Sequence, residues 1–224
     1  MKSLKLYINE ALHINRNTKI QRYNYHPKTK NELKDLIKKF IRERGHYADL
    51  NDIDTSEITD MSYVFFNSKF NGDISNWDVS KVENMHAMFW NADFNGDISK
   101  WDVSKVENMG AMFEYSKFNG DISNWDVSKV ENMSGTFVYS EFNGDISNWD
   151  VSKVENMYGM FHNSNFNGDI SKWNVGNVGT MQHMFSNSPF NGDISNWDVN
   201  NVKDMNHMFT GSPLEKNPPK WYKK

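Results

Sequence analysis

The chain of 224 residues contains no cysteine. Disulfide bonds, thiolate metal ligands and a cysteine nucleophile are therefore excluded. No stretch reaches the ~18–20 consecutive apolar residues of a membrane-spanning helix, so we expect no membrane insertion. The opening "MKSLKLYINEALHINRN" lacks the apolar core and the small-residue cleavage site of a secretory signal. We expect a protein that is cytoplasmic as synthesised, while a final location on a cell surface or in a phage particle stays open.

The chain is polar overall, and its charge is unevenly distributed. Mean hydropathy is −0.77 and the formal net charge is −4. Residues 1–45 hold 12 Lys and Arg against 4 Asp and Glu, so this part is strongly basic. A basic segment can indicate nucleic-acid binding. Most of this charge, however, belongs to one amphipathic helical pattern whose polar face is solvated, so we expect no nucleic-acid partner.

One phrase returns every 24 residues. "FNGDISNWDVSKVENM" begins at Phe70 and recurs with small changes at Phe94, Phe118, Phe142, Phe166 and Phe190. Counting back by 24 finds a degenerate copy in "LNDIDTSEITDMSYVFFNSKF". Such a period is typical of stacked repeats, because no unit buries its apolar face alone. We predict one degenerate first turn and six full repeats over residues 46–213.

The pattern within a repeat predicts its local structure. Residues 76–79 alternate as a short strand does, and the apolar residues of 82–89 recur at helical spacing. Ser80 and Glu83 match the capping box that begins a helix. The Asn-Gly pair near the start of the phrase tolerates positive φ and makes a turn. Each unit is therefore predicted to be a strand, a capped helix and a turn.

These residues resemble a known family, the BspA-like leucine-rich repeat. More closely, "FNGDISNWDVSKVENM…MF" resembles the Trp- and Met-rich variant in bacterial surface-protein repeats, over about residues 47–214. The resemblance implies a right-handed α/β solenoid of short parallel strands and short helices. It also implies binding or adhesion without catalysis in a protein exported to a cell surface. The sequence departs from that pattern because it shows neither an export signal nor a wall anchor. The matching positions are Ile74, Trp77, Asp78, Val79, Val82, Met85, Met88, Phe89, Ala92 and Phe94.

Both ends are predicted to be caps. A helix should begin at a capping box at Thr29 and end near Gly45, and residues 1–45 should cover the open end of the first turn. Residues 214–224 should form the C-terminal cap, with Trp221 folded over the last turn. The apolar stripe of the N-terminal helix is Leu33, Leu36, Ile37, Phe40 and Ile41.

The first dozen residues allow two interpretations. Residues 4–12 carry a helical apolar stripe, which predicts a second cap helix. "MKSLKLYINEA" also resembles the N-terminal capsid-targeting peptides of tailed phages, which implies processing after Glu10 in the motif Ile8-Asn9-Glu10. On the second interpretation the protein is a structural or assembly component of a phage particle.

Two columns of aspartates suggest calcium, where a column is a set of residues 24 apart. Repeat-borne calcium sites draw several oxygens from each loop, and here each loop offers few, so we predict that these carboxylates accept N–H bonds of their own turns. His183 and His207 share a column and should stack, but a zinc site needs further ligands; we predict surface histidines, no metal and no cofactor. The aspartates are Asp73, Asp97, Asp121, Asp145, Asp169 and Asp193, and Asp78, Asp102, Asp126, Asp150 and Asp198.

Regular repetition also argues against catalysis. A catalytic site is a single constellation, whereas these carboxylates recur identically in every unit, so we predict that the protein is not an enzyme. A column of tryptophans resembles a sugar-binding ladder, but its place between core residues predicts buried packing with each indole N–H partnered. The column is Trp77, Trp101, Trp125, Trp149, Trp173 and Trp197.

The binding prediction rests on the variable positions, columns 86–87, 90–91 and 93 in the numbering of the second turn. They change between copies, whereas Lys81 recurs in three further repeats. Two explanations stay open, namely tolerant helix-end positions and diversification for binding, for which exposed aromatic residues are suited. We predict a monomeric, noncatalytic recognition or adhesion module that binds a protein, or a surface glycan, through this helix-side stripe. The candidate residues are His86, Trp90, Asn91, Glu114, Tyr115, Tyr139, Tyr158, His162, His183 and His207.

Overall fold

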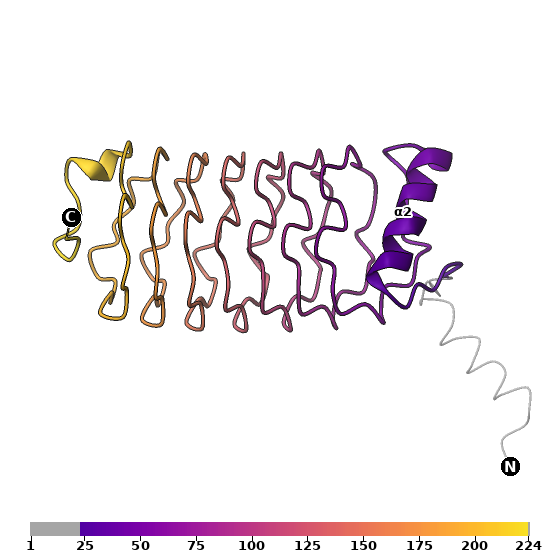
Figure 1. The fold of residues 1–224 in the computed structure, drawn as a ribbon, viewed down its shortest axis with the longest axis horizontal. Coiled ribbons are helices and arrows are strands. Elements are labelled where there is room, and N and C mark those ends of the chain that lie inside the picture. The colour runs from indigo at the N-terminus through magenta and orange to yellow at the C-terminus, as the bar shows by residue number, and fades with distance from the viewer. Residues whose placement is uncertain (1–22, 224) are drawn as a thin grey trace, which may run out of the picture.

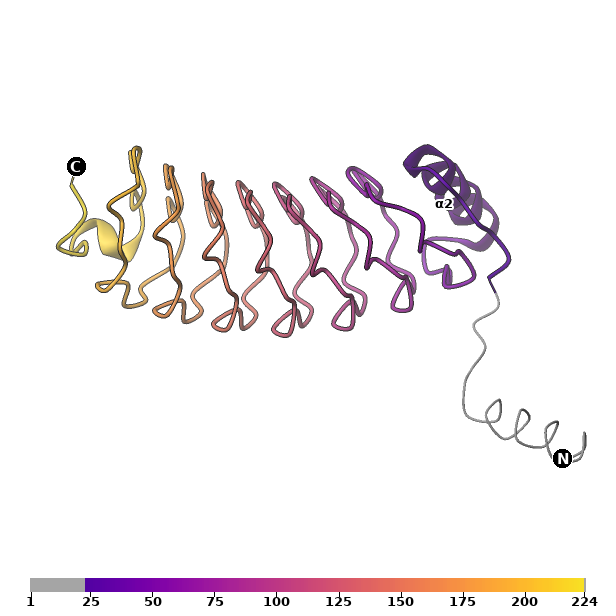
Figure 2. The same cartoon turned by 90° about the horizontal axis from the view of Figure 1, so that it is seen from below.

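The computed structural model describes residues 23–223. The chain winds in successive turns along one axis, between helix α2 (Lys30–Arg44) and a C-terminal segment that contains the short 3-10 helix η1 (Pro213–Glu215) (Figure 1). Figure 2 shows the same stack of turns from below, with α2 at its N-terminal end. Within the described range, no helix is both long and apolar enough to cross a membrane.

Hydrogen bonds between neighbouring turns hold the stack together. Isolated parallel bridges join residues 24 apart, from Asp60 and Asn84 onward to Thr180 and Asp204. Alternate backbone N–H groups after each bridge donate to carbonyl groups of the next turn. Those of Met85, Ala87, Phe89 and Asn91 donate to carbonyls 23 residues later, at 2.8–2.9 Å.

The predicted short helix in each repeat is wrong. Ala87 and Asn91 have φ of 51° and 48°, and this left-handed conformation cannot continue a right-handed helix. Met88 N–H bonds back to the Met85 carbonyl at 3.1 Å and Ala92 N–H to the Phe89 carbonyl at 3.2 Å. These i→i+3 bonds close successive tight turns, which place apolar side chains in the core at the spacing that had indicated a helix.

The predicted strand over residues 76–79 is also wrong. Trp77 N–H donates to the Ile74 carbonyl at 3.1 Å, which closes a turn, and the bridge lies further on, at Asn84. Ser80 N–H donates to Asp78 Oδ1 at 3.0 Å, so Ser80 is a turn residue and caps no helix. We propose that the winding is a solenoid, built from tight turns instead of strand–helix units.

The tryptophan column lies in the core, as predicted. The indole N–H of Trp77 donates to the Leu50 carbonyl of the preceding turn at 3.0 Å, and the later tryptophans repeat this bond 27 residues back. Trp221 continues the column, because it donates to the Ile194 carbonyl at 2.9 Å and stacks 6.4 Å from Trp197. The prediction that Trp221 folds over the last turn is confirmed.

Polar columns form ladders and turns on the surface. Asn95 N–H donates to Asn71 Oδ1 at 2.9 Å, and the same bond recurs along the column to the pair formed by Asn191 and Asn167. The turn role predicted for the aspartates is confirmed; Asp121 Oδ1, for example, accepts Ser123 N–H at 2.9 Å. This backbone hydrogen bond holds the pKa of Asp121 below its usual value.

Helix α2 forms where the sequence predicts it. Thr29 Oγ1 accepts Glu32 N–H at 3.2 Å, and Glu32 Oε2 accepts Lys28 N–H at 2.6 Å, so the cap reaches one residue further back than a standard capping box. Leu33, Ile37 and Phe40 are buried against the first turn. Gly45, at φ 87°, ends the helix.

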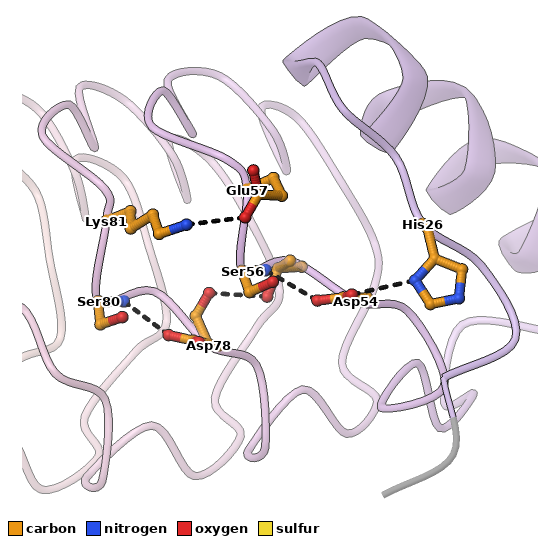
Figure 3. A network of polar contacts seen from close by, with 8 residues as sticks. His26, Asp54, Ser56, Glu57, Asp78, Ser80 and Lys81 are labelled. Carbon is orange, nitrogen blue, oxygen red and sulfur yellow. Dashed lines mark hydrogen bonds and ion pairs between the residues drawn. The ribbon is translucent and has the colours of Figure 1, made fainter.

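Polar contacts join this N-terminal region to the first turns (Figure 3). His26 Nδ1 and Asp54 Oδ2 lie 3.0 Å apart, and Lys81 Nζ lies 2.7 Å from Glu57 Oε1 of the preceding turn. The Lys81–Glu57 pair is half exposed on both sides, so solvent weakens it. Side chains of the cap and of the first two turns thus form one network along the stack.

Candidate functional site

A continuous row of aromatic rings runs along one edge of the stack. We call it the aromatic row, and each ring contacts one in the next turn. Neighbouring ring centroids within the row lie 4.6–5.9 Å apart, for example 4.6 Å for Phe66–Trp90, 4.7 Å for Tyr115–Tyr139 and 5.1 Å for His183–His207. The row consists of Phe66, Trp90, Tyr115, Tyr139, His162, His183 and His207.

Four members of the row are exposed, namely Phe66, the two tyrosines and His207. Tyr115 and Tyr139 are 45% and 47% exposed, and Phe66 is 41% exposed. Trp90 was predicted to be exposed, and this prediction is wrong, because the indole is half-buried between the Phe66 and Tyr115 rings. The predicted stacking of His183 on His207 is confirmed at an interplanar angle of 10°.

Two tyrosines of the row have a left-handed backbone conformation, which other residue types adopt more readily. Tyr115 and Tyr139 have φ of 55° and 52°. A left-handed conformation costs an ordinary side chain roughly 1–2 kcal/mol, whereas Asn and Gly adopt it readily. The other turns follow this preference. The residues of the same column are Asn67, Asn91, Asn163, Asn187 and Gly211.

A groove of about 420 Å³ lies beside the row. Its floor is formed by Ala111, Gly135 and Gly159, which share column 87. This column holds large residues on either side of the small ones, Tyr63 before them and His183 after them. His183 also lines the groove. The change from large to small residues within one column therefore creates the hollow.

The walls of the groove carry the titratable groups. Tyr115, Tyr139 and His162 lie on the side of the aromatic row, together with Glu114. Burial raises the pKa of the half-buried Glu114 carboxyl, and an interaction with the Trp90 indole opposes this shift. Burial, with the nearby His183, lowers the pKa of His162.

Further polar atoms of the groove lack partners inside the protein. Nδ1 of His162 and Nδ1 of His183 are buried and accept or donate no hydrogen bond among residues 23–223. Over the same range, no group of three or more His, Asp or Glu side chains is placed to hold a metal ion. The arrangement offers aromatic edges and one carboxylate to a ligand, while these two imidazole nitrogen atoms are buried.

The remaining residues predicted to bind a partner lie in different parts of the structure. His86 lines the groove and contacts the Tyr63 ring edge-on at 5.1 Å. Tyr158, 47% exposed, also lines it. Asn91 lies outside the groove, and its Nδ2 donates to Asn67 Oδ1 at 2.7 Å, which is a contact between turns. Glu10, with the rest of the N-terminal peptide, lies outside the described residues.

Sequence reasoning missed Tyr63 and Phe66 and the floor of the groove. Tyr63 and Phe66 stand in the degenerate first turn, at columns 87 and 90. Their rings lie 5.6 Å apart and extend the row to the first turn. Extending the comparison of variable columns to that turn would have found them. The run of Ala and Gly in column 87 was the available signal for the floor.

The fold and this surface define a repeat protein with a conserved backbone pattern inside each turn and a variable aromatic edge. Residues 33–141 and residues 114–221 both match the family described as "Mycoplasma protein of unknown function, DUF285". Because these two matches span most of the chain, the protein belongs to this family. Searches of curated proteins and of solved structures found no match. The double match is consistent with a bacterial repeat family, and the resemblance to BspA-like repeats stays a prediction.

Proposed function

We propose that this protein is a noncatalytic recognition module that binds a protein partner through the aromatic row and the groove beside it. The observation that carries the proposal is the pair Tyr115 and Tyr139. Both are exposed, and both occupy left-handed positions where the neighbouring turns have Asn or Gly. A residue kept in an unfavourable conformation on a surface points to a role other than stability.

The geometry of the row favours a protein over a glycan. Sugar rings bind by stacking on open aromatic faces. The Tyr115 and Tyr139 rings lie 4.7 Å apart at 7°, whereas a ring inserted between them would need about 7 Å. The surface therefore offers ring edges and hydroxyl groups. Tyrosine presented in this way supplies large contact area and hydrogen bonds at low entropic cost, as in many protein interfaces.

The scaffold suits this role because the backbone is held from turn to turn. The N–H groups of Ala111, Phe113 and Tyr115 donate to the next turn at 2.7–2.9 Å. A surface that is already ordered loses little conformational entropy on binding. The side chains at these positions are free to differ, since main-chain atoms make the bonds.

The test is capture of partners from extracts of the producing organism or its host, followed by affinity measurement on the purified partner. The test variant is Tyr115→Asn with Tyr139→Asn, since Asn occupies the same column in other turns. The control is Tyr47→Ala, which removes a tyrosine that is 81% exposed and takes no part in the aromatic row. We expect the control to bind as the native protein does and the test variant to lose at least tenfold in affinity.

Two results would contradict the proposal. If the folded double variant binds as tightly as the native protein, the row is not the interface. If Tyr47→Ala loses as much affinity as the double variant, aromatic exposure in general, and not this row, governs capture.

A further inference from the structure

One carboxylate lies inside the groove and has no cationic partner there. Glu114 is half-buried in the wall, and its Oε2 would lie 3.6 Å from a Cβ built on Gly135, so the carboxylate overhangs the floor. Among residues 23–223, no Lys or Arg forms an ion pair with it, and none lines the groove. Apart from the interaction with the Trp90 indole, the charge is therefore available to a ligand.

The surroundings make this charge unfavourable when the groove is empty. Burial raises the pKa of Glu114, which means that the ionised form is poorly solvated at this position. A carboxylate removed from water is stabilised strongly by a cation at hydrogen-bond distance. The Trp90 indole interacts with it, and the titratable groups that share the lining of the groove with it are His86, Tyr115, Tyr139, Tyr158, His162 and His183.

The shape of the groove selects the rest of the ligand. Ala111, Gly135 and Gly159 make a narrow floor without branched side chains, and Val138 supplies an apolar wall. His183 closes the end of the floor, since its ring stands where the preceding turns have glycine. An unbranched alkyl chain fits such a trough, and Lys and Arg bury their alkyl stems along apolar surfaces while the charged end reaches a polar group.

We propose that this groove binds a basic side chain, lysine or arginine, of the partner protein. The cationic group pairs with the Glu114 carboxylate, and the alkyl stem lies over Gly135 and Gly159. The inference rests on the proposed function, because it names the chemistry by which that same surface selects its partner.

The test uses two acetylated and amidated peptides, Ala-Ala-Lys-Ala-Ala and the same peptide with norleucine in place of lysine. Norleucine keeps the alkyl stem and removes the charge. Binding to the full chain is followed by NMR, through the backbone N–H signals of Gly135 and Gly159. We expect the lysine peptide to bind about tenfold or more tightly than the norleucine peptide, and Glu114→Gln to abolish the difference.

Glu141→Gln is the matched control, because Glu141 is an exposed carboxylate of a neighbouring turn that does not line the groove. This variant should keep the preference for lysine. Equal binding of the two peptides to the native protein would overturn the inference. So would a preference for lysine that survives in Glu114→Gln, and so would binding of neither peptide at millimolar concentration.

The inference and the proposed function fail in different ways. A protein partner that is lost with Tyr115→Asn and Tyr139→Asn, but retained by Glu114→Gln, leaves the recognition function in place and refutes the basic side chain. A partner that all three substitutions leave bound refutes both.

Discussion

Gly135 and Ala111 occupy the same position in adjacent turns, and both have a left-handed backbone, with φ of 63° and 54°. The turn geometry can therefore be tested by replacing glycine with alanine at one of these positions and alanine with glycine at the other. We predict that Gly135→Ala lowers the free energy of unfolding and that Ala111→Gly raises it. The backbone conformation is the same at the two positions, so the two effects should be similar in size and opposite in sign.

The size of the expected change in the free energy of unfolding follows from two contributions. An alanine in the left-handed region costs roughly 1–2 kcal/mol relative to its preferred conformation. Glycine loses more conformational freedom on folding, which offsets about 0.4–1 kcal/mol of this difference. Sterics add nothing at Gly135, since a Cβ there would lie 3.6 Å from the nearest atoms of Glu114 and Val138. The net effect is about 1 kcal/mol in favour of glycine at either position.

Thermal unfolding followed by circular dichroism measures the difference. For a chain of this length, 1 kcal/mol corresponds to a change in Tm of about 2–4 °C. We expect a fall of that size for Gly135→Ala and a rise of that size for Ala111→Gly. Shifts of the same sign in the two variants would refute the left-handed turn at this column.

A third glycine separates backbone strain from crowding. Gly144 is not left-handed, but a Cβ on it would lie 2.9 Å from two atoms of the Phe142 ring, which is closer than real side chains approach. Gly144→Ala should therefore lower Tm by more than Gly135→Ala does. A smaller fall at Gly144 would mean that the Phe142 ring moves aside without cost.

Three further predictions concern side chains. Tyr139→Asn should leave Tm within about 3 °C, because backbone relief of about 1 kcal/mol offsets the loss of about 1 kcal/mol of ring contact; a fall beyond 5 °C or so would make the tyrosine structural. Trp125→Phe leaves the Ile98 carbonyl without the indole N–H that now donates to it at 3.1 Å, so the melt should shift downward by roughly 4–8 °C for about 2 kcal/mol. The lowered pKa of His162, caused by burial and by His183, means that the unfolded chain binds its proton first. Stability should therefore fall as pH drops below the usual value of 6.5 toward the lowered pKa, and His162→Gln should reduce this dependence in melts at pH 7 and pH 5.5; an unchanged dependence would assign it to another group.

The period and the buried columns could be predicted because they depend only on which residues are apolar. Ile74, Trp77, Val79 and Val82 are at most 4% exposed in the second turn, and the same columns are buried in the next four repeats, whereas Val199 and Val202 of the last repeat are partly buried. Helix α2 was predictable for a similar reason, because its cap, stripe and terminal glycine all lie within one local segment. Local signals that agree with each other give reliable elements.

The conformation of the turns could not be inferred from apolar spacing. Residues at the spacing of Val82, Met85 and Met88 face one side in a helix and also in this series of tight turns. The two structures differ in where the backbone N–H groups donate. Here they donate to carbonyl groups 23 residues further along the chain, and a pattern within one short segment does not reveal such a bond. The one local signal was column 91, where Asn and Gly predominate, as expected for a left-handed position.

The distinction between positions that hold the fold together and positions that can vary explains where a binding surface can develop on this protein. Main-chain bonds and the apolar core columns determine how each turn stacks, so the residues of columns 86, 87, 90 and 91 can change without altering the spacing. Replacing a large residue by glycine at column 87 then opens a groove, and replacing Asn by Tyr at column 91 builds its wall at a backbone cost of roughly 1–2 kcal/mol. Gly135 and Tyr139, which stand at these two columns in one turn, combine both changes where Glu114 reaches over the floor. Stability alone gives no preference for tyrosine over Asn at position 139, since the ring contact and the backbone cost are each about 1 kcal/mol, whereas the proposed recognition function accounts for the tyrosine through contact with a partner.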